Sequence, residues 1–348
     1  MITKLQILKH DNGGARIGVE IKDMVKNLKW VTDLNYSAGE LTFDIVNGKD
    51  PIIPAMGAIV DFAWDNKDIF WGFVFSAECT SDTTVSVKAY DFERYLKSEG
   101  SVVFQSGTLG DRYSNVCRRF GVPFHIKEQP IYRVPAEVCD GKTGFDMIKS
   151  AIDKTYSATG EMYCIVANHM YIELRRAPIP TRTLLVIDTQ NTMTDYTYSE
   201  SIYNAANVVQ VVQKNTDNSQ TKTATATSDT GDDPATTSFT IASARGNTIK
   251  TWGQIVKVVN AKNKANWAQM VQQANDELKK RNVSERKLTL DCIGDTSLIA
   301  GAGANVKIKD FGKTWTNCPI LKATHNFGTD YTCSLEMKAG TKWQENSL

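Results

Sequence analysis

The fold is decided by two neighbouring stretches of the chain, Phe70-Trp71-Gly72-Phe73-Val74-Phe75 and Val85-Ser86-Val87-Lys88-Ala89-Tyr90-Asp91-Phe92-Glu93-Arg94-Tyr95-Leu96. Apolar and polar residues alternate at the start of the second stretch, and again around Phe43. Successive side chains of a strand point to opposite faces, so this period of two predicts an antiparallel sheet with one buried face and one face in water. Residues 1–104 are therefore predicted to form an all-β domain. Its turns are expected at Asn12-Gly13-Gly14, Asn47-Gly48 and Asp65-Asn66.

The pattern changes in residues 105–183. Residues 109–120 place apolar side chains at helical spacing and meet Gly121, which suits the position after a helix. Thr143 suits the N-cap of a second helix, with Gly160 just past its end. A hairpin is predicted over 161–174. This range is therefore predicted to be a small α+β domain inserted between all-β parts.

Residues 184–348 are predicted to form a second all-β domain, because alternation returns around Leu290 and Leu335. The segment 214–238 is almost purely polar, with too few apolar groups to offset the ~1 to 2 kcal/mol per residue of ordering entropy. It is predicted to be a mobile loop or a long exposed hairpin. Residues 263–281 have one apolar face and predict a long amphipathic helix that covers a sheet. The Lys279-Lys280-Arg281 cluster at its end suits either the helix dipole or a docking patch.

A short internal echo links the two β-rich parts of the chain. Gly57-Ala58-Ile59-Val60-Asp61-Phe62 and Gly303-Ala304-Asn305-Val306-Lys307-Ile308 share the pattern Gly-Ala-x-Val-x-apolar. Each lies in a predicted β segment that further strands follow. The echo suggests two related barrels separated by an insert.

Composition excludes several classes of protein. The chain has 348 residues, with 40 Lys and Arg against 39 Asp and Glu and a formal net charge of +1, so no excess positive charge is available to neutralise a run of phosphates. No apolar stretch approaches the ~18 to 20 residues that cross a bilayer. The N-terminal sequence lacks the pattern of a secretory signal, and the 7 cysteines are widely spread and form no CxxC pair. We therefore expect a cytosolic origin and cysteines that behave as buried apolar residues.

The sequence offers no recognisable catalytic, metal or cofactor site. There is no GxSxG motif, and the four histidines, His10, His125, His169 and His325, have no second ligand at a metal-binding spacing on a convincing helix. His169 is expected to be solvated in a hairpin turn. Gly301-Ala302-Gly303 leads into a strand and is interpreted as a turn. Asp229, Asp232 and Asp233 lack the rest of a calcium loop, and Asp291 with Asp295 is the nearest carboxylate pair in the last third.

The chain resembles the baseplate hub proteins of phage tails and phage-like particles, the group called XkdQ or late control protein D. In that family an aromatic-Gly strand precedes an "A-Y-D-x-x-x-x-L" stretch, which Ala89, Tyr90, Asp91 and Leu96 fill here. Asn204-Ala205-Ala206-Asn207-Val208-Val209 is similar to the strand that opens the second half in the family. The amphipathic helix then precedes a last Gly-x-x-Val strand.

The resemblance implies a mainly β fold of two tail-tube-like β-barrels, a small α+β domain and one long amphipathic helix. It also implies a non-enzymatic homotrimer whose six barrels form a pseudo-six-fold ring between a six-fold tail tube and a three-fold spike. The expected partners are the tail tube protein, the central spike protein and neighbouring baseplate proteins, with no membrane, sequence-specific nucleic acid, cofactor or metal. The chain would be made in the bacterial host cytoplasm and assembled in the virion or extracellular particle. The alternative is a particle-associated cell-wall hydrolase or glycan-binding module that uses Trp315 and Trp343.

Overall fold

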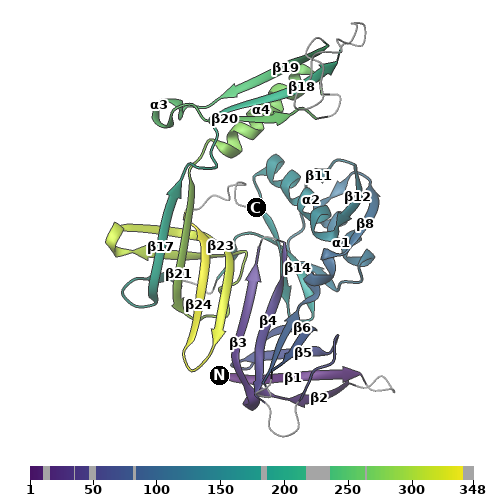
Figure 1. The fold of residues 1–348 in the computed structure, drawn as a ribbon, viewed down its shortest axis with the longest axis vertical. Coiled ribbons are helices and arrows are strands. Elements are labelled where there is room, and N and C mark those ends of the chain that lie inside the picture. The colour runs from purple at the N-terminus through teal and green to yellow at the C-terminus, as the bar shows by residue number, and fades with distance from the viewer. Residues whose placement is uncertain are drawn as a thin grey trace. The chain divides into compact units, whose positions relative to one another are not determined.

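The computed structural model describes residues 1–10, 16–34, 36–46, 52–80, 84–181, 186–216, 236–262 and 265–339. The chain forms two compact units (Figure 1). Among the described residues, unit 1 contains 1–198 and 287–339, and unit 2 contains 199–286. No helix within the described ranges is both long enough and apolar enough to cross a bilayer.

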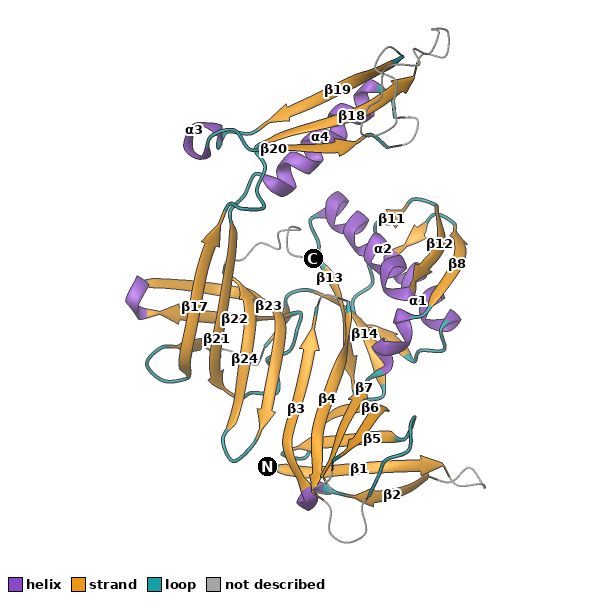
Figure 2. Ribbon diagram, in the orientation of Figure 1, coloured by secondary structure: helices purple, strands orange, loops and turns teal. Residues whose placement is uncertain are grey.

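Unit 1 is built around one large sheet. In chain order its strands are β1 (Ile2–His10), β2 (Arg16–Glu20), β3 (Val25–Asp33), β4 (Ser37–Val46), β5 (Ile59–Trp64), β6 (Lys67–Cys79), β7 (Thr84–Tyr90), β15 (Ile179–Pro180), β16 (Val186–Asp188), β17 (Met193–Ser201), β21 (Glu285–Ile293), β22 (Ala302–Ile308), β23 (Lys313–Phe327) and β24 (Tyr331–Lys338). The hydrogen-bonded path runs β17-β21-β24-β23-β3-β4-β7-β6-β5-β1-β2, with β22 branching from β23. Figure 2 shows β17, β21, β24, β23, β3 and β4 in a row. Among the described residues this path is open and forms no closed barrel, whereas the sequence led us to expect two barrels.

The strand order of unit 1 occurs twice. β3 to β7 lie in the order β3-β4-β7-β6-β5, and β17 with β21 to β24 lie in the order β17-β21-β24-β23-β22. Both series therefore follow the same order of first, second, fifth, fourth and third strand. We call β3 to β7 the first repeat, and β17 with β21 to β24 the second repeat. The antiparallel pair β23–β3 joins the two repeats within the chain.

Two local details support the equivalence of the repeats. The pairing of β6 with β7 shifts between Val74 and Ser76, and the pairing of β23 with β24 shifts between Ile320 and Lys322. The N–H of Gly57 donates to the carbonyl of Val74 over 2.9 Å, and the N–H of Gly301 donates to the carbonyl of Ile320 over 2.9 Å. Both glycines have positive φ, 78° and 88°, which glycine adopts without a Cβ penalty.

The sequence echo lies in equivalent strands but in the wrong register. Hydrogen bonding makes Gly57 equivalent to Gly301, whereas the echo aligned Gly57 with Gly303. Gly301 and Gly303 are two residues apart, and a register shift of two residues keeps every side chain on its face of the strand. The Gly-Ala steps that correspond in space are therefore Gly57-Ala58 and Gly301-Ala302.

The predicted alternation places the same faces of both repeats in the core. The alternating residues of both repeats are buried, namely Leu41, Phe43, Ile45, Val85, Val87 and Ala89 in the first, and Leu288, Leu290, Cys292, Cys333, Leu335 and Met337 in the second. Full burial of a large apolar side chain contributes ~1.5 to 3 kcal/mol, so these two faces supply much of the stabilisation of unit 1. The predicted turn at Asp65-Asn66 joins β5 to β6, and both of its residues have positive φ.

The inserted α+β segment also belongs to unit 1. It contains η2 (Phe92–Lys97), β8 (Glu99–Phe104), β9 (Gly107–Thr108), α1 (Leu109–Arg119), β10 (Phe124–Ile126), β11 (Arg133–Val134), β12 (Glu137–Thr143), α2 (Gly144–Thr159), β13 (Tyr163–Asn168) and β14 (Tyr171–Arg176). The predicted caps of α2 are confirmed. Thr143 forms a capping box with Asp146, and Gly160 ends the helix with a φ of 73°.

Unit 2 is a three-stranded sheet with one covering helix. It contains β18 (Val208–Thr216), β19 (Thr237–Arg245), α3 (Ile249–Trp252), β20 (Val256–Asn260) and α4 (Trp267–Arg281), with strand order β19-β18-β20. Met270 and Ala274 of α4 pack with Val211 and Ala242 of the sheet. The helix begins at Trp267, later than predicted, because Asn266 forms a capping box with Gln269. Of the predicted polar segment, 217–235 lies outside the described residues.

The observed units differ from the predicted division at 104 and 183. The range 184–348 is split, because β23 and β24 belong to the same sheet as β3 whereas residues 199–286 have a core of their own. Two short 3₁₀ turns complete the described structure, η1 (Lys22–Met24) and η3 (Lys309–Phe311).

Candidate functional site

The histidines do not form a catalytic or metal-binding group with one another. His325 is fully buried, its Nδ1 lies 2.8 Å from the hydroxyl of Tyr331 and its Nε2 lies 3.0 Å from the carbonyl of Leu298. A carbonyl only accepts, so Nε2 carries the proton and Nδ1 accepts from the tyrosine. Burial lowers the pKa of His325 to about 4, and the ring is therefore neutral at pH 7. The His125 ring packs edge-on against another ring, and the His10 side chain lies outside the described residues.

His169 lies in the β13–β14 turn as predicted, but it is not simply solvated. Its Nε2 lies 3.1 Å from Oδ1 of Asp61, and ligand atoms of Asp61, Asp68 and His169 lie within 4.8 Å of one another. The Lys4 ammonium lies 2.9 Å from Asp61 and 2.8 Å from Asp68. Although burial opposes it, His169 and Lys4 hold the pKa of Asp61 below its usual value. The cation of this cluster is thus a lysine of the chain, and the cluster ties the β13–β14 turn to β1, β5 and β6.

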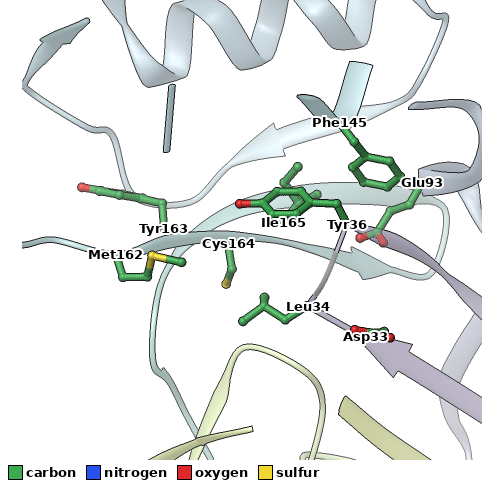
Figure 3. A pocket seen from close by; sticks show the side chains of 9 residues that line it. All are labelled: Asp33, Leu34, Tyr36, Glu93, Phe145, Met162, Tyr163, Cys164 and Ile165. Atoms are coloured by element: carbon green, nitrogen blue, oxygen red, sulfur yellow. The ribbon is translucent and has the colours of Figure 1, made fainter. Parts of the chain in front are cut away.

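Two adjoining pockets are lined by carboxylates, two of which, Asp91 and Glu93, are buried. They share Asp33 and Glu93, and they enclose about 280 and 310 Å³ including the space open to solvent. Figure 3 shows Asp33 and Glu93 on one side of the first pocket and Met162 and Tyr163 on the other. Within the described residues the Glu93 carboxylate has no hydrogen bond or ion pair, although its side chain is buried.

The backbone holds Asp91 beneath this pocket. Asp91 is the N-cap of η2, and its Oδ1 accepts a 2.9 Å hydrogen bond from the N–H of Glu93. A Cβ on Gly39 would overlap the Asp91 carboxylate, so glycine is needed there. Burial raises the pKa of Asp91, and burial together with the charges of Asp91 and Asp33 raises the pKa of Glu93. Both acids therefore keep their protons to a higher pH than exposed carboxylic acids do. The Cys164 thiol also lines the first pocket, and burial raises its pKa to about 12.

Sequence reasoning did not single out this pair of acids. The sequence feature that could have indicated buried acids is Tyr90-Asp91-Phe92-Glu93, in which two acids lie among aromatic residues at the end of a strand. Their burial follows from the β13–β14 segment, which contributes Ile165 and Val166 to the pockets from far along the chain.

The other residues considered from sequence do not converge. The Ser334 hydroxyl donates to Asp291, whereas Asp295 accepts from Ser297 in a separate bond. Trp315 is half-buried, and its ring stacks on that of Tyr198 with a centroid distance of 5.5 Å. Lys279, Lys280 and Arg281 lie in the last turn of α4, a position that suits both the helix dipole and a docking patch. Asp229, Asp232, Asp233 and Trp343 lie outside the described residues.

The remaining candidate is an assembly surface formed by strand edges. β17 pairs with β21 and has no strand on its other side within the described residues. β6 pairs with β5 through Lys67–Phe73 and with β7 through Phe73–Cys79, so one edge of its second half is also without a strand in the described structure. Open edges of this kind are templates for pairing with another chain.

The profile of the YQBQ-like family matches residues 28–338, which is most of the sequence. The chain belongs to this family. The matched range contains both repeats, the inserted α+β segment and unit 2. The family assignment therefore covers the doubled sheet and not a single domain.

Two Bacillus subtilis (strain 168) proteins are similar to this chain along most of its length. The uncharacterized protein YqbQ is 27% identical over 285 residues, and the phage-like element PBSX protein XkdQ is 26% identical over 292 residues. Each match covers 81% of this chain and 81% of the relative. The resemblance to the XkdQ group stated from sequence is confirmed.

The fold is shared with a solved tail protein. The 43 kDa tail protein of prophage MuSo2 from Shewanella oneidensis superposes with a TM-score of 0.67 at 9% identity, over 96% of this chain and 98% of that one. At this identity the similarity concerns the fold. A YQBQ-like chain thus has a tail-protein architecture.

Proposed function

We propose that this chain is a structural baseplate hub of a phage tail or phage-tail-like particle. Three copies form a ring in which the two repeats of each chain occupy six quasi-equivalent positions. A ring of that kind meets a six-fold tail tube on one side and a three-fold spike on the other. The repeated strand order is the observation that carries this proposal, because a doubled unit in a trimer supplies six similar surfaces.

Each repeat, in this proposal, is the counterpart of one tail-tube-like barrel. Its open edges are completed by neighbouring repeats, so an isolated chain has an open sheet where the ring has a continuous one. The partners are the tail tube protein, the central spike protein and neighbouring baseplate proteins. The name of the B. subtilis relative, a protein of a phage-like element, supports this setting. The chain is made in the cytoplasm of the bacterial host and ends in the virion or particle.

Native mass spectrometry of the full chain, alone and mixed with the tail tube and spike proteins of its particle, tests the proposal. We expect a species of three times 38.6 kDa that binds both proteins. A chain that stays monomeric under all of these conditions would refute the hub.

The hub has no catalytic activity in this proposal. Asp291 and Asp295 are bound in separate structural contacts, and the Trp315 ring stacks on a neighbouring ring. We expect purified protein to leave peptidoglycan undegraded and unbound. Release of muropeptides would instead support the cell-wall hydrolase that the sequence left as the alternative.

A further inference from the structure

We propose that the second half of β6 in one copy pairs antiparallel with β17 of the next copy, and so repeats between chains the β23–β3 junction that each chain contains within itself. The inference rests on the ring proposed above and identifies the strands that join it. The occupant of each open edge is therefore a second copy of this chain.

The junction within the chain is the template. In the β23–β3 pair the residues face one another from Lys322 and Asp33 to Phe327 and Leu28. This pair joins the fourth strand in path order of the second repeat to the first strand of the first repeat. The equivalent strands that remain are β6 and β17. Each has, in the described structure, its open edge on the side that the template junction uses.

The bulges fix which residues of β6 would take part. Ser76 follows the register shift in β6 as Lys322 follows it in β23. Three residues further along each strand are Cys79 and His325. In the template, His325 faces Trp30. Cys79 therefore takes the place of His325 in the contact between copies.

Hydrogen bonds fix the corresponding residue of β17. Leu41 faces both Trp30 and Ala89, and Leu288 faces Met337 in the equivalent place of the second repeat. The N–H of Ile293 donates to the carbonyl of Thr192 over 2.9 Å. Further along the pair, Glu200 bonds both Ser284 and Arg286, and Tyr198 packs on the core that contains Leu288. Side chains directly opposite one another share a face of the sheet, so the register shifts by one residue and brings Glu200 opposite Arg286 and Tyr198 opposite Leu288. Tyr198 therefore takes the place of Trp30.

The predicted contact places Cys79 opposite Tyr198, Glu78 opposite Ser199 and Ala77 opposite Glu200. No like charges face one another in these pairs, and like charges would be unfavourable there. In the single chain Cys79 is exposed and Tyr198 is half-buried. The contact is heterologous, since it uses a different edge on each copy, and such contacts either close into a ring or extend into a filament.

Cysteine crosslinking of the full chain tests this pairing. Cys79 is the natural exposed cysteine and the other six are buried, so one substitution, Tyr198→Cys, creates the expected pair. Residues directly opposite in an antiparallel sheet lie ~4.5 to 5.5 Å apart at Cα, within the range of a disulfide. After oxidation with diamide, we expect covalent dimers and then a covalent trimer as the end product on a non-reducing denaturing gel.

Two variants are matched controls. Thr194→Cys is exposed on the same strand but roughly 13 Å away at ~3.3 Å per residue, and we expect it to give no ladder. Cys79→Ser combined with Tyr198→Cys lacks one partner and should also give none. These controls separate pairing in register from random collision.

The outcomes separate this inference from the proposed function. Trimers by native mass spectrometry without a crosslink between Cys79 and the cysteine of Tyr198→Cys would overturn the edge pairing and leave the hub intact. Monomers without crosslinks would overturn both. A reaction that stops at covalent dimers would indicate a reciprocal contact and overturn the inference, whereas a ladder beyond the trimer would support the pairing but contradict the three-copy ring.

Discussion

At the scale of single residues, Glu93 is a buried acid whose carboxylate has no hydrogen bond or ion pair within the described residues. Its raised pKa lies above its value in the unfolded chain, so the folded state binds the extra proton. Below pH ~4 Glu93 is protonated in both the folded and the unfolded chain, so its raised pKa does not lower the free energy of unfolding. This free energy falls as the pH rises from there toward the pKa of Glu93 in the folded chain. Burial also raises the pKa of Asp91, so this acid likewise makes the folded chain less stable as the pH rises.

We predict that Glu93→Gln raises the melting temperature at pH 8 and changes it little at pH 5. The amide keeps the shape of the protonated acid but cannot ionise. Thermal unfolding followed by circular dichroism at the two pH values measures the effect, and Glu99→Gln is an exposed control. An equal shift at both pH values would show that the charge of Glu93 is not the cause.

His325 is predicted to give the free energy of unfolding the opposite dependence on pH. Its pKa of about 4 in the folded chain lies below the ~6.5 of an unfolded histidine, so stability is lost as the pH falls through this interval. His325→Phe retains the stacking position on Trp30, where the ring centroids are 4.8 Å apart, but leaves Tyr331 without its acceptor. We expect a loss of ~1 to 3 kcal/mol at pH 7 and a flatter stability profile from pH 7 to pH 5. Urea unfolding across that range measures both, and a profile as steep as in the parent chain would contradict the prediction.

At the scale of elements, the equivalent glycines Gly57 and Gly301 form a matched pair. Both have positive φ, but a Cβ on Gly57 would meet nothing within 4 Å whereas one on Gly301 would lie 2.8 Å from Sγ of Cys164. We predict that Gly57→Ala costs ~1 to 2 kcal/mol for the backbone alone, and that Gly301→Ala costs more because the buried Cys164 side chain must also shift. Denaturant unfolding of the two variants gives the comparison. Equal losses would mean that the Cys164 contact relaxes without cost.

Sequence patterns predicted some elements well and others not at all. The caps of α2 were visible because Thr143 and Gly160 are local signals that need no distant partner. β17 was not predicted, because most of its side chains are polar and exposed and thus show no apolar alternation. Its position follows from pairing with β21, which unit 2 separates from it in the chain. The buried acids were missed for the same reason, since residues far along the chain cover them.

At the scale of the whole molecule, the doubling was suggested by a six-residue echo, but the echo alone gave the register wrong by two residues. The strand order and the backbone hydrogen bonds give the correct register, because they show which residues of the two repeats occupy equivalent positions. A short match of residue types can arise by chance. The division into units was not visible in the sequence. It depends on the β23–β3 pair, whose strands are nearly a whole chain apart.

We predict that unit 2 can be removed without loss of unit 1. The apolar core of unit 2 is its own, whereas the 105–183 segment shares one core with the second repeat. A chain in which residues 202–284 are replaced by an Asn-Gly turn should retain cooperative unfolding by circular dichroism. The matched deletion of 105–183 should abolish it. Loss of folding in the first variant would show that unit 1 depends on unit 2.

Unit 2 interrupts the second repeat between β17 and β21, whereas β3 and β4 of the first repeat are joined by a short connection. The two halves of the chain are therefore alike in their sheet but distinguishable by this insertion. In the proposed three-copy ring, a partner that binds the sheet meets six similar sites, one on each repeat. A partner that binds unit 2 meets three sites, because only the second repeat of each chain carries unit 2. One gene product can in this way present two different periodicities to the molecules that surround it.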